Sequence, residues 1–109
     1  MPHRPREITI GALANRTGLA PSAIRYYEEE GLVHPERTAA GQRRFLRADI
    51  RRLSFVMIAQ KLGFPLARIR ALLDAQPERR TPNARDWRRI STGMRSELDA
   101  RIAELEALR

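Results

Sequence analysis

The sequence of 109 residues predicts a mostly α-helical fold, with four short helices and a small β wing followed by one long C-terminal helix. Three observations support this prediction. Apolar residues recur at helical spacing through most of the chain. Isolated glycines and prolines separate the periodic stretches from one another. One stretch between the second and third helices is rich in turn residues and has the character of a short hairpin.

The first two helices are expected on either side of a short turn. The first begins after Thr9, whose hydroxyl can accept a hydrogen bond from a free N–H of the first turn, and ends at Gly18. The second begins at Pro21, because the fixed φ of proline suits the first helical position, and ends at Gly31. Ala20 is a poor N-cap for it. Two short helices joined in this way form the outline of a helix-turn-helix.

The hairpin and two further helices complete the expected N-terminal unit. Residues 32–35 and 41–45 are predicted as extended pieces around a turn-rich tip, and we interpret this hairpin as a wing. A third helix is expected from Ala48 until Gly63 interrupts it, and a fourth restarts at Pro65. Together these elements predict a winged helix-turn-helix domain.

The sequence predicts a division into three parts. Residues 1–75 form the winged domain, residues 76–84 contain two prolines without an apolar pattern and are interpreted as a connector, and residues 85–109 form the last helix. The apolar stripe of that helix follows the α-helical period of about 3.6 residues rather than a long heptad repeat. Because an isolated helix has no core of its own to cover, we expect the stripe to associate with a second copy. The expected dimer-interface residues are Trp87, Ile90, Met94, Leu98, Ile102 and Leu105.

Composition restricts the class of protein. There are 21 Lys and Arg against 13 Asp and Glu, and the net charge of +8 favours a polyanion such as nucleic acid or an anionic membrane. The absence of cysteine excludes disulfides and thiolate metal sites within these residues. No stretch approaches the roughly 20 apolar residues of a membrane span, and the first residues lack a signal-peptide pattern. We therefore expect a cytoplasmic protein with no membrane partner.

The second helix offers candidate DNA contacts. Ser22, Arg25 and Tyr26 lie near its start, opposite its apolar side, and a DNA major groove is wide enough to admit a helix. Arg25 could contact a phosphate or a guanine edge. Alternatively, it could pair with Glu28 or Glu29 of its own helix, and Tyr26 could belong to the core.

A second set of candidates surrounds the wing. Seven basic residues and a single acidic one lie between Arg37 and Lys61. Such a density of like charge is unfavourable unless an anion neutralises it, which a DNA backbone would do; a solvated basic face is the alternative. Arg51 and Arg52 could also be surface residues of the third helix. The complete set of expected DNA-binding residues is Thr9, Arg16, Ser22, Arg25, Tyr26, Arg43, Arg44, Arg47 and Lys61.

The sequence offers no candidate for catalysis or metal binding. The two histidines, His3 and His34, have no carboxylate pair or serine at a suggestive spacing, and the glycines are isolated rather than gathered in a phosphate-binding loop. Because no nucleophile, base and orienting group can be assembled, we predict that the chain is not an enzyme.

Four motifs occur in an order that resembles the MerR family of transcription regulators. Any one motif alone would be weak evidence for the family, but the four motifs in this order are specific to it. They are Ile24-Arg25-Tyr26-Tyr27-Glu28, Gly31-Leu32-Val33, Gln42-Arg43-Arg44-Phe45 and Gly63-Phe64-Pro65-Leu66. The stretch from Pro77 to Ile102 is similar, more narrowly, to the SoxR branch of that family.

The resemblance implies a homodimer in which the long helix pairs antiparallel with that of its partner, in the manner of a coiled coil, on a two-fold promoter operator. It implies that Ser22, Arg25, Tyr26, Arg43 and Arg44 contact double-stranded DNA, and that the loop before Leu66 forms a second wing against phosphate. Members of the family deform the promoter spacer so that RNA polymerase can use it. Such a deformation costs on the order of a few kcal/mol.

One departure from the SoxR branch is clear. Relatives in that branch carry a 2Fe-2S cluster on cysteines after the dimer helix, and this sequence contains none. Either the sequence ends before such a sensor or the chain is a short family member, and we expect no cofactor in these residues. Two other functions remain open: an architectural or excisionase-like DNA-binding factor, and a protein-interaction module in which the basic surface is incidental.

Overall fold

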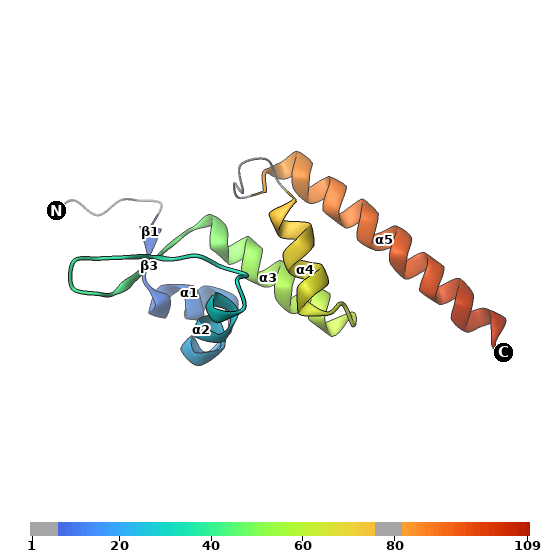
Figure 1. Cartoon of the computed structure of the whole chain (residues 1–109), viewed down its shortest axis with the longest axis horizontal. Helices are drawn as coiled ribbons and strands as arrows, with labels where there is room; N and C mark the ends of the chain where they lie inside the picture. Colours follow the sequence, from blue (N-terminus) through green and yellow to red (C-terminus); the bar gives the residue numbers. More distant parts are fainter. Residues whose placement is uncertain (1–6, 76–81) are drawn as a thin grey trace.

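The computed structural model describes residues 7–75 and 82–109, and it confirms the mostly helical class with a small wing and a long last helix. Figure 1 colours the chain from its N-terminus to its C-terminus and labels most of the elements. They are β1 (Glu7–Ile8), α1 (Ile10–Thr17), α2 (Pro21–Glu29), β2 (Glu36–Arg37), β3 (Arg43–Leu46), α3 (Ala48–Lys61), α4 (Leu66–Asp74) and α5 (Ala84–Ala107). Most of the expected connector, residues 76–81, lies outside the described residues.

The expected boundaries of the first two helices are confirmed. The backbone N–H of Ala12 donates to Oγ1 of Thr9 at 3.1 Å, so the threonine caps α1. Gly18 ends α1 in the left-handed conformation with φ of 78°. Pro21 begins α2 after Ala20, which makes no side-chain cap hydrogen bond. The turn between α1 and α2 is therefore set by local residue preferences.

The wing differs from its prediction in two ways. The sheet has three strands in the order β1-β3-β2, both pairs are antiparallel, and the first strand was not predicted. The second strand also begins later than expected, at Glu36, and residues 32–35 form no strand. Leu32 and Val33 are fully buried, so these residues fill the core instead of pairing in the wing.

The core lies between the helices of the N-terminal unit and the first half of α5. Its centre is α3, which contributes Leu53, Val56 and Ala59, all fully buried. Side chains from α1, α2, β3 and α4 surround them: Leu13, Ile24, Phe45, Ile69 and Leu73. No helix among the described residues is long and apolar enough to span a bilayer.

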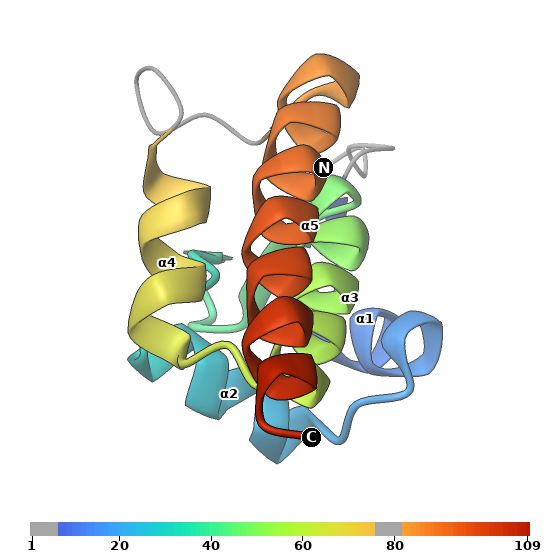
Figure 2. The same cartoon turned by 90° about the vertical axis from the view of Figure 1, so that its right-hand side faces the viewer.

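The long helix α5 is partly a core element, so the first half of the stripe that the sequence predicts at a dimer interface packs within its own chain. Trp87, Ile90 and Met94 are each at least 93% buried within the chain, and the ring centroids of Trp87 and Phe55 lie 5.2 Å apart. Figure 2 shows the reason: α5 lies alongside α3 and α4, so its first half closes the core. Figure 1 shows its second half extending beyond the body, where Ile102 is 51% exposed.

The start of α5 carries a signal that the sequence analysis missed. The side chain of Asn83 accepts a hydrogen bond from the backbone N–H of Asp86, and the Asp86 carboxylate accepts one from the backbone N–H of Asn83, each at 2.9 Å. This capping box begins the helix at Ala84, one residue before the expected start. The pair Asn83 and Asp86 is visible in the sequence at the required spacing.

Candidate nucleic-acid interface

The exposed face of α2 carries all three residues of this helix that the sequence predicts as DNA contacts. Ser22, Arg25 and Tyr26 are exposed, whereas Ile24 and Tyr27 are buried on the opposite side. Tyr26 therefore does not belong to the core. Arg25 makes no hydrogen bond or ion pair within the described ranges, so the alternative of pairing on its own helix is not realised. The helix presents a guanidinium, a hydroxyl and a phenol to solvent.

Tyr26 and Tyr27 have different roles on α2. The hydroxyl of Tyr26 donates to Oε1 of Glu30 at 3.4 Å, and desolvation, followed by the charge of Glu30, raises the pKa of Tyr26 above its ordinary value of 10.0. The phenol is therefore a neutral donor at physiological pH. The hydroxyl of Tyr27 donates to Oε1 of Gln60 at 2.5 Å, which connects α2 to α3.

Two arginines hold the C-terminal end of α2. Nη1 of Arg70, from α4, donates to the carbonyl oxygen of Glu30 at 2.6 Å. Nε of Arg52, from α3, donates to the carbonyl oxygen of Leu32 at 2.5 Å. Cations at this end of a helix satisfy its free carbonyls and oppose the negative end of its dipole. The C-terminal end of α2 and the segment that follows it are therefore held by contacts from α4 and α3.

Arg52 is not a surface residue, contrary to one of the alternatives considered for it. It is 5% exposed, and its Nη2 lies 3.7 Å from Oδ1 of Asp74. Asp49 is also buried and accepts a hydrogen bond from the backbone N–H of Leu46 at 3.0 Å. Burial raises the pKa of Asp49 above its ordinary value of 3.8, although the Leu46 hydrogen bond and the Arg52 charge partly oppose this. These buried charges fix the junction of β3 and α3.

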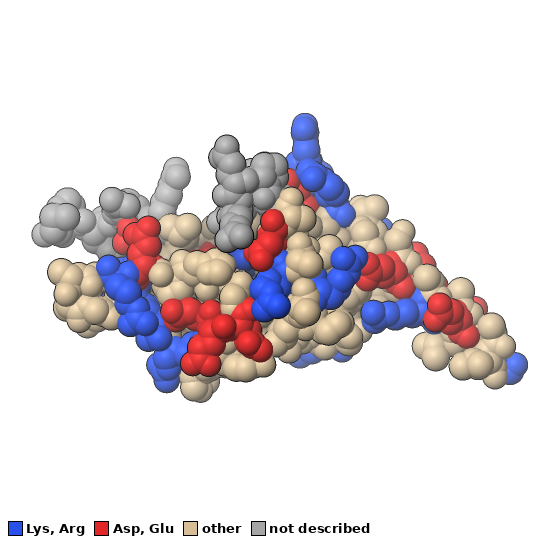
Figure 3. All heavy atoms as spheres, in the orientation of Figure 1, with Lys and Arg blue, Asp and Glu red and all other residues tan. Residues whose placement is uncertain are grey.

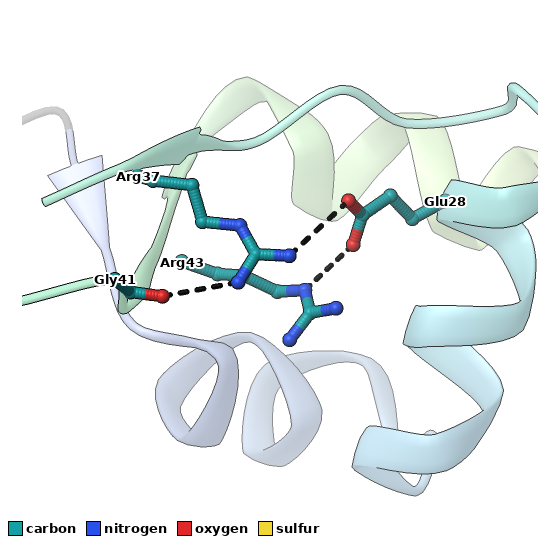
Figure 4. A network of polar contacts seen from close by, with 4 residues as sticks. All are labelled: Glu28, Arg37, Gly41 and Arg43. Atoms are coloured by element: carbon teal, nitrogen blue, oxygen red, sulfur yellow. Dashed lines mark hydrogen bonds and ion pairs between the residues drawn. The ribbon is translucent and has the colours of Figure 1, made fainter.

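The wing is tied to α2 through a single carboxylate, which Figure 4 shows. Nε of Arg43, on β3, lies 2.6 Å from Oε1 of Glu28, and Nη2 of Arg37, on β2, lies 3.9 Å from Oε2 of the same residue. Nη1 of Arg37 also donates to the carbonyl oxygen of Gly41 at 3.0 Å, within the wing turn. Sequence reasoning did not assign Glu28 to the wing, because the two partners are brought together only by the tertiary fold.

A hollow next to the wing gathers three of the expected DNA-binding residues. Thr9, at the start of α1, lines it together with Arg43 and Arg44, and its volume is about 340 Å³. Both arginines are half-buried, and Nη1 of Arg44 makes a long contact of 3.4 Å with the carbonyl oxygen of Arg43. The start of the first helix, its capping threonine and the wing cations therefore form one surface.

The remaining predicted contacts are exposed and lie at the ends of two different helices. Arg16 lies in the last turn of α1, Arg47 immediately before α3, and Lys61 at the end of α3. Figure 3 shows that positive and negative side chains alternate on the face in view. The net charge of +8 is therefore not concentrated on this face.

The loop that the resemblance assigns to a second wing lies against α5. Phe64 is buried, and the guanidinium carbon of Arg101 lies 4.8 Å from its ring centroid. A Cβ added to Gly63 would lie 3.8 Å from Nη1 of the same arginine. The long helix thus contacts a loop that is expected to meet DNA.

An apolar groove lies between α3 and α5. It has a volume of about 320 Å³ and is lined by Phe55, Ile58, Leu62, Met94 and Leu98 among others. Ile58 and Leu62 are 59% and 46% exposed, so two large apolar side chains meet solvent within one groove. Among the described residues, no group of three His, Cys, Asp or Glu side chains is placed to hold a metal ion.

Two family models match the chain and together cover residues 8–109. The model described as MerR HTH family regulatory protein matches residues 8–76, and the model described as MerR, DNA binding matches residues 50–109. The first contains the two helices of the helix-turn-helix and the wing, and the second contains the groove between α3 and α5.

Several curated relatives are transcriptional regulators. An HTH-type transcriptional activator SoxR homolog from Chromobacterium violaceum is 49% identical over 102 residues, which are 94% of this chain and 69% of that protein. The regulator HmrR from Rhizobium leguminosarum bv. viciae is 36% identical over 94% of this chain and 78% of that protein. ZntR from Escherichia coli K12 is 36% identical over 91% of this chain and 71% of that protein. All three are named as transcriptional regulators, which agrees with the prediction that the chain is not an enzyme.

Solved structures show the same fold. HiNmlR, a MerR family regulator lacking the sensor domain and bound to promoter DNA, has a TM-score of 0.59 at 20% identity and covers 94% of this chain and 84% of its own. PbrR691 from Ralstonia metallidurans CH34, in complex with lead(II), has a TM-score of 0.59 at 24% identity. The match covers 93% of this chain and 79% of that one. The solved structures share the fold, and the two family models and the curated relatives identify the family. The chain therefore belongs to the MerR family and is a DNA-binding transcriptional regulator.

Proposed function

We propose that the chain regulates transcription as a homodimer that binds a two-fold symmetric promoter operator and deforms the promoter spacer for RNA polymerase. The observation that carries the proposal is the exposed position of Arg25 on α2, the helix that Glu28 ties to the wing arginine Arg43. A relative of this fold, HiNmlR, is bound to promoter DNA.

The DNA contacts divide into two kinds in this proposal. Ser22, Arg25 and Tyr26 enter the major groove from α2, where a guanidinium can contact base edges. The wing arginines and Thr9 meet phosphates beside it, because they surround one hollow next to the start of α1. The outlying cations Arg16, Arg47 and Lys61 make further phosphate contacts, which supply affinity but no sequence preference.

The second copy is proposed to occupy the groove between α3 and α5. The end of α5 extends beyond the body, where Ile102, Leu105 and Leu108 are 51%, 65% and 83% exposed. The groove residues Ile58 and Leu62 are exposed in the same chain. An antiparallel pairing of two α5 helices brings each exposed end towards the groove of the other copy, which buries both apolar surfaces. The shorter interface stripe is then Leu98, Ile102 and Leu105.

We also propose that these residues hold no iron-sulfur cluster and that the regulator acts in the cytoplasm, where it has access to DNA. Such clusters are held by cysteine thiolates, and the sequence contains no cysteine. The residues present therefore do not fit the cofactor of the SoxR branch.

Selection of DNA from a randomised duplex pool at physiological salt tests the proposal. The wild-type chain is compared with an Arg43→Gln/Arg44→Gln variant and with an Arg85→Gln/Arg88→Gln variant, which removes the same charge from exposed positions on α5. We expect a common two-fold symmetric site for the wild type and the control, and its loss in the wing variant. Recovery of sequences without a common site would refute operator binding, because a basic protein binds any DNA at low salt.

Light scattering across a range of protein concentrations tests the homodimer. We expect the wild type to be dimeric at micromolar concentration, and a Leu62→Glu variant to be monomeric with an unchanged circular dichroism spectrum. The substitution places a charge in the groove but is tolerated in the free chain, because Leu62 is 46% exposed. A dimeric Leu62→Glu protein would show that the copies associate elsewhere.

A further inference from the structure

We propose that Glu28 is a positioning residue for DNA binding, which holds the wing guanidinium of Arg43 in place for a phosphate contact. The inference rests on the proposed function, in which α2 and the wing meet DNA together. It assigns a role in DNA affinity to an acidic side chain, although acidic side chains near DNA ordinarily weaken binding.

The geometry places one carboxylate between the two strands of the wing and the recognition helix. Glu28 lies in the last turns of α2, and its two oxygens are directed to different arginines: Oε1 to Arg43 at 2.6 Å and Oε2 to Arg37 at 3.9 Å. Arg37 and Arg43 are paired across the antiparallel strands β2 and β3. Figure 4 shows that Glu28 reaches both from the side of α2. The carboxylate therefore sets the position of the wing relative to the recognition helix.

The contact leaves the phosphate-binding part of Arg43 available. A guanidinium has five N–H donors, and Glu28 accepts from Nε alone. Within the described residues, neither Nη atom of Arg43 makes a hydrogen bond or an ion pair. The two Nη atoms can therefore bind a phosphate while Nε stays on Glu28, and the Nη groups of an arginine suit the bidentate geometry of phosphate oxygens.

Holding the side chain in advance reduces the entropic cost of binding. A free arginine loses much of its rotamer freedom when it is ordered at an interface. The side chains of Arg43 and Glu28 are only 23% and 26% exposed, so this pair is less screened by solvent than an open surface pair. The free protein thus already has the conformation that the phosphate contact requires.

Glu28 and its neighbour Glu29 allow this role to be separated from simple charge repulsion. Removing an acidic charge near DNA strengthens binding if long-range electrostatics alone act, whereas removing a positioning contact weakens it. Glu28→Gln keeps the size of the side chain but loses the charge that holds Arg43. Glu29→Gln makes the same charge change one residue away, at an exposed position that makes no ion pair with an arginine of residues 7–75 or 82–109.

The experiment measures dissociation constants at several salt concentrations on two probes: the duplex that the wild-type chain selects from a random pool, and a scrambled duplex of the same composition. We expect Glu28→Gln to bind the selected duplex about fivefold more weakly and the scrambled duplex as well as or better than the wild type. Glu29→Gln should bind both at least as well as the wild type. Glu28→Asp, which keeps the charge but withdraws the carboxylate from Arg43, should also weaken binding to the selected duplex.

A double variant shows whether Glu28 acts through Arg43. In an Arg43→Gln background, the weakening caused by Glu28→Gln should disappear, because the contact it supports is already absent. A weakening that persists there would overturn the proposal, as would a Glu28→Gln protein that binds the selected duplex as tightly as Glu29→Gln does. If the wild type selects no common site, the proposed operator binding is refuted as well. A normal wild-type selection without weakening of Glu28→Gln refutes only the positioning role.

Discussion

The buried guanidinium of Arg52 donates its Nε–H to the carbonyl oxygen of Leu32 at 2.5 Å, across a sequence separation of 20 residues. The contact joins α3 to the segment where α2 has ended and the wing has not yet begun. Nη2 of the same side chain lies 3.7 Å from Asp74 on α4. One arginine therefore connects the segment after α2, the helix at the centre of the core and the fourth helix.

Replacing Arg52 by Met should strongly destabilise the fold. The change leaves the Leu32 carbonyl without its hydrogen bond and removes a positive charge that acts on the buried Asp49, and the loss of such buried interactions costs about 3 kcal/mol. Urea unfolding at neutral pH measures this loss. Arg88→Met is the matched control, because it removes an exposed arginine and should change stability by less than about 0.5 kcal/mol. Equal stability of the two variants would show that the Arg52 contacts contribute little.

Asp49 should make stability depend on pH in a direction opposite to that of most carboxylates. Burial raises its pKa in the folded state, so the folded chain binds the proton more tightly than the unfolded chain does. This contribution to stability is fully present below the ordinary pKa of 3.8 and is lost as the pH rises through the raised value. Asp49→Asn does not titrate, so its stability relative to the wild type should increase as the pH rises. Urea unfolding between about pH 4 and pH 7 measures this difference, and parallel profiles would contradict it.

The two halves of α5 should respond differently to truncation. Trp87→Ala removes a buried ring that contacts Phe55 and should lower the free energy of unfolding by about 3 to 5 kcal/mol at any protein concentration. Leu105→Ala removes a side chain that is 65% exposed within the chain, so its effect should appear only where two copies associate. Thermal unfolding at several protein concentrations distinguishes them. A concentration-independent loss in Leu105→Ala would contradict the proposed interface.

Gly93→Ala should stabilise the chain by about 0.5 to 1 kcal/mol. Gly93 lies inside α5, and a Cβ added there meets no atom within 4 Å, so alanine gains helix propensity without a clash. The comparison variant is Gly31→Ala, at a φ of 76°, where the new Cβ would lie 3.3 Å from Cδ of Arg70. That variant should be destabilised instead. A Gly93→Ala protein with a lower melting temperature would show that this face of α5 is covered by a second copy.

Arg25→Ala should reduce the sequence preference of DNA binding more than its overall strength. Arg25 is exposed on α2 and free of partners among the described residues, so its guanidinium is available for a base edge. We expect a loss of about 1 to 3 kcal/mol on the selected duplex and little change on a scrambled one. Equal weakening on both duplexes, with a smaller salt dependence, would instead identify Arg25 as a phosphate contact.

The sequence by itself determined the helix boundaries and the family. Thr9, Gly18, Pro21 and Gly63 act on their own backbone and their nearest neighbours, so their effects can be predicted without knowledge of the fold. The exposed face of α2 follows from helical periodicity in the same way. For these elements the structure agrees with the prediction, because the deciding interactions span at most one helical turn.

The tertiary structure alone decided what each charged or apolar side chain does. Glu28 meets Arg43 across 15 residues, Arg52 meets Leu32 across 20, and Arg70 meets Glu30 across 40. Trp87 resembles an interface residue in the sequence but is buried against Phe55, because α5 folds back onto α3. A periodic pattern specifies that a face is apolar, whereas the surface that covers it depends on the path of the whole chain.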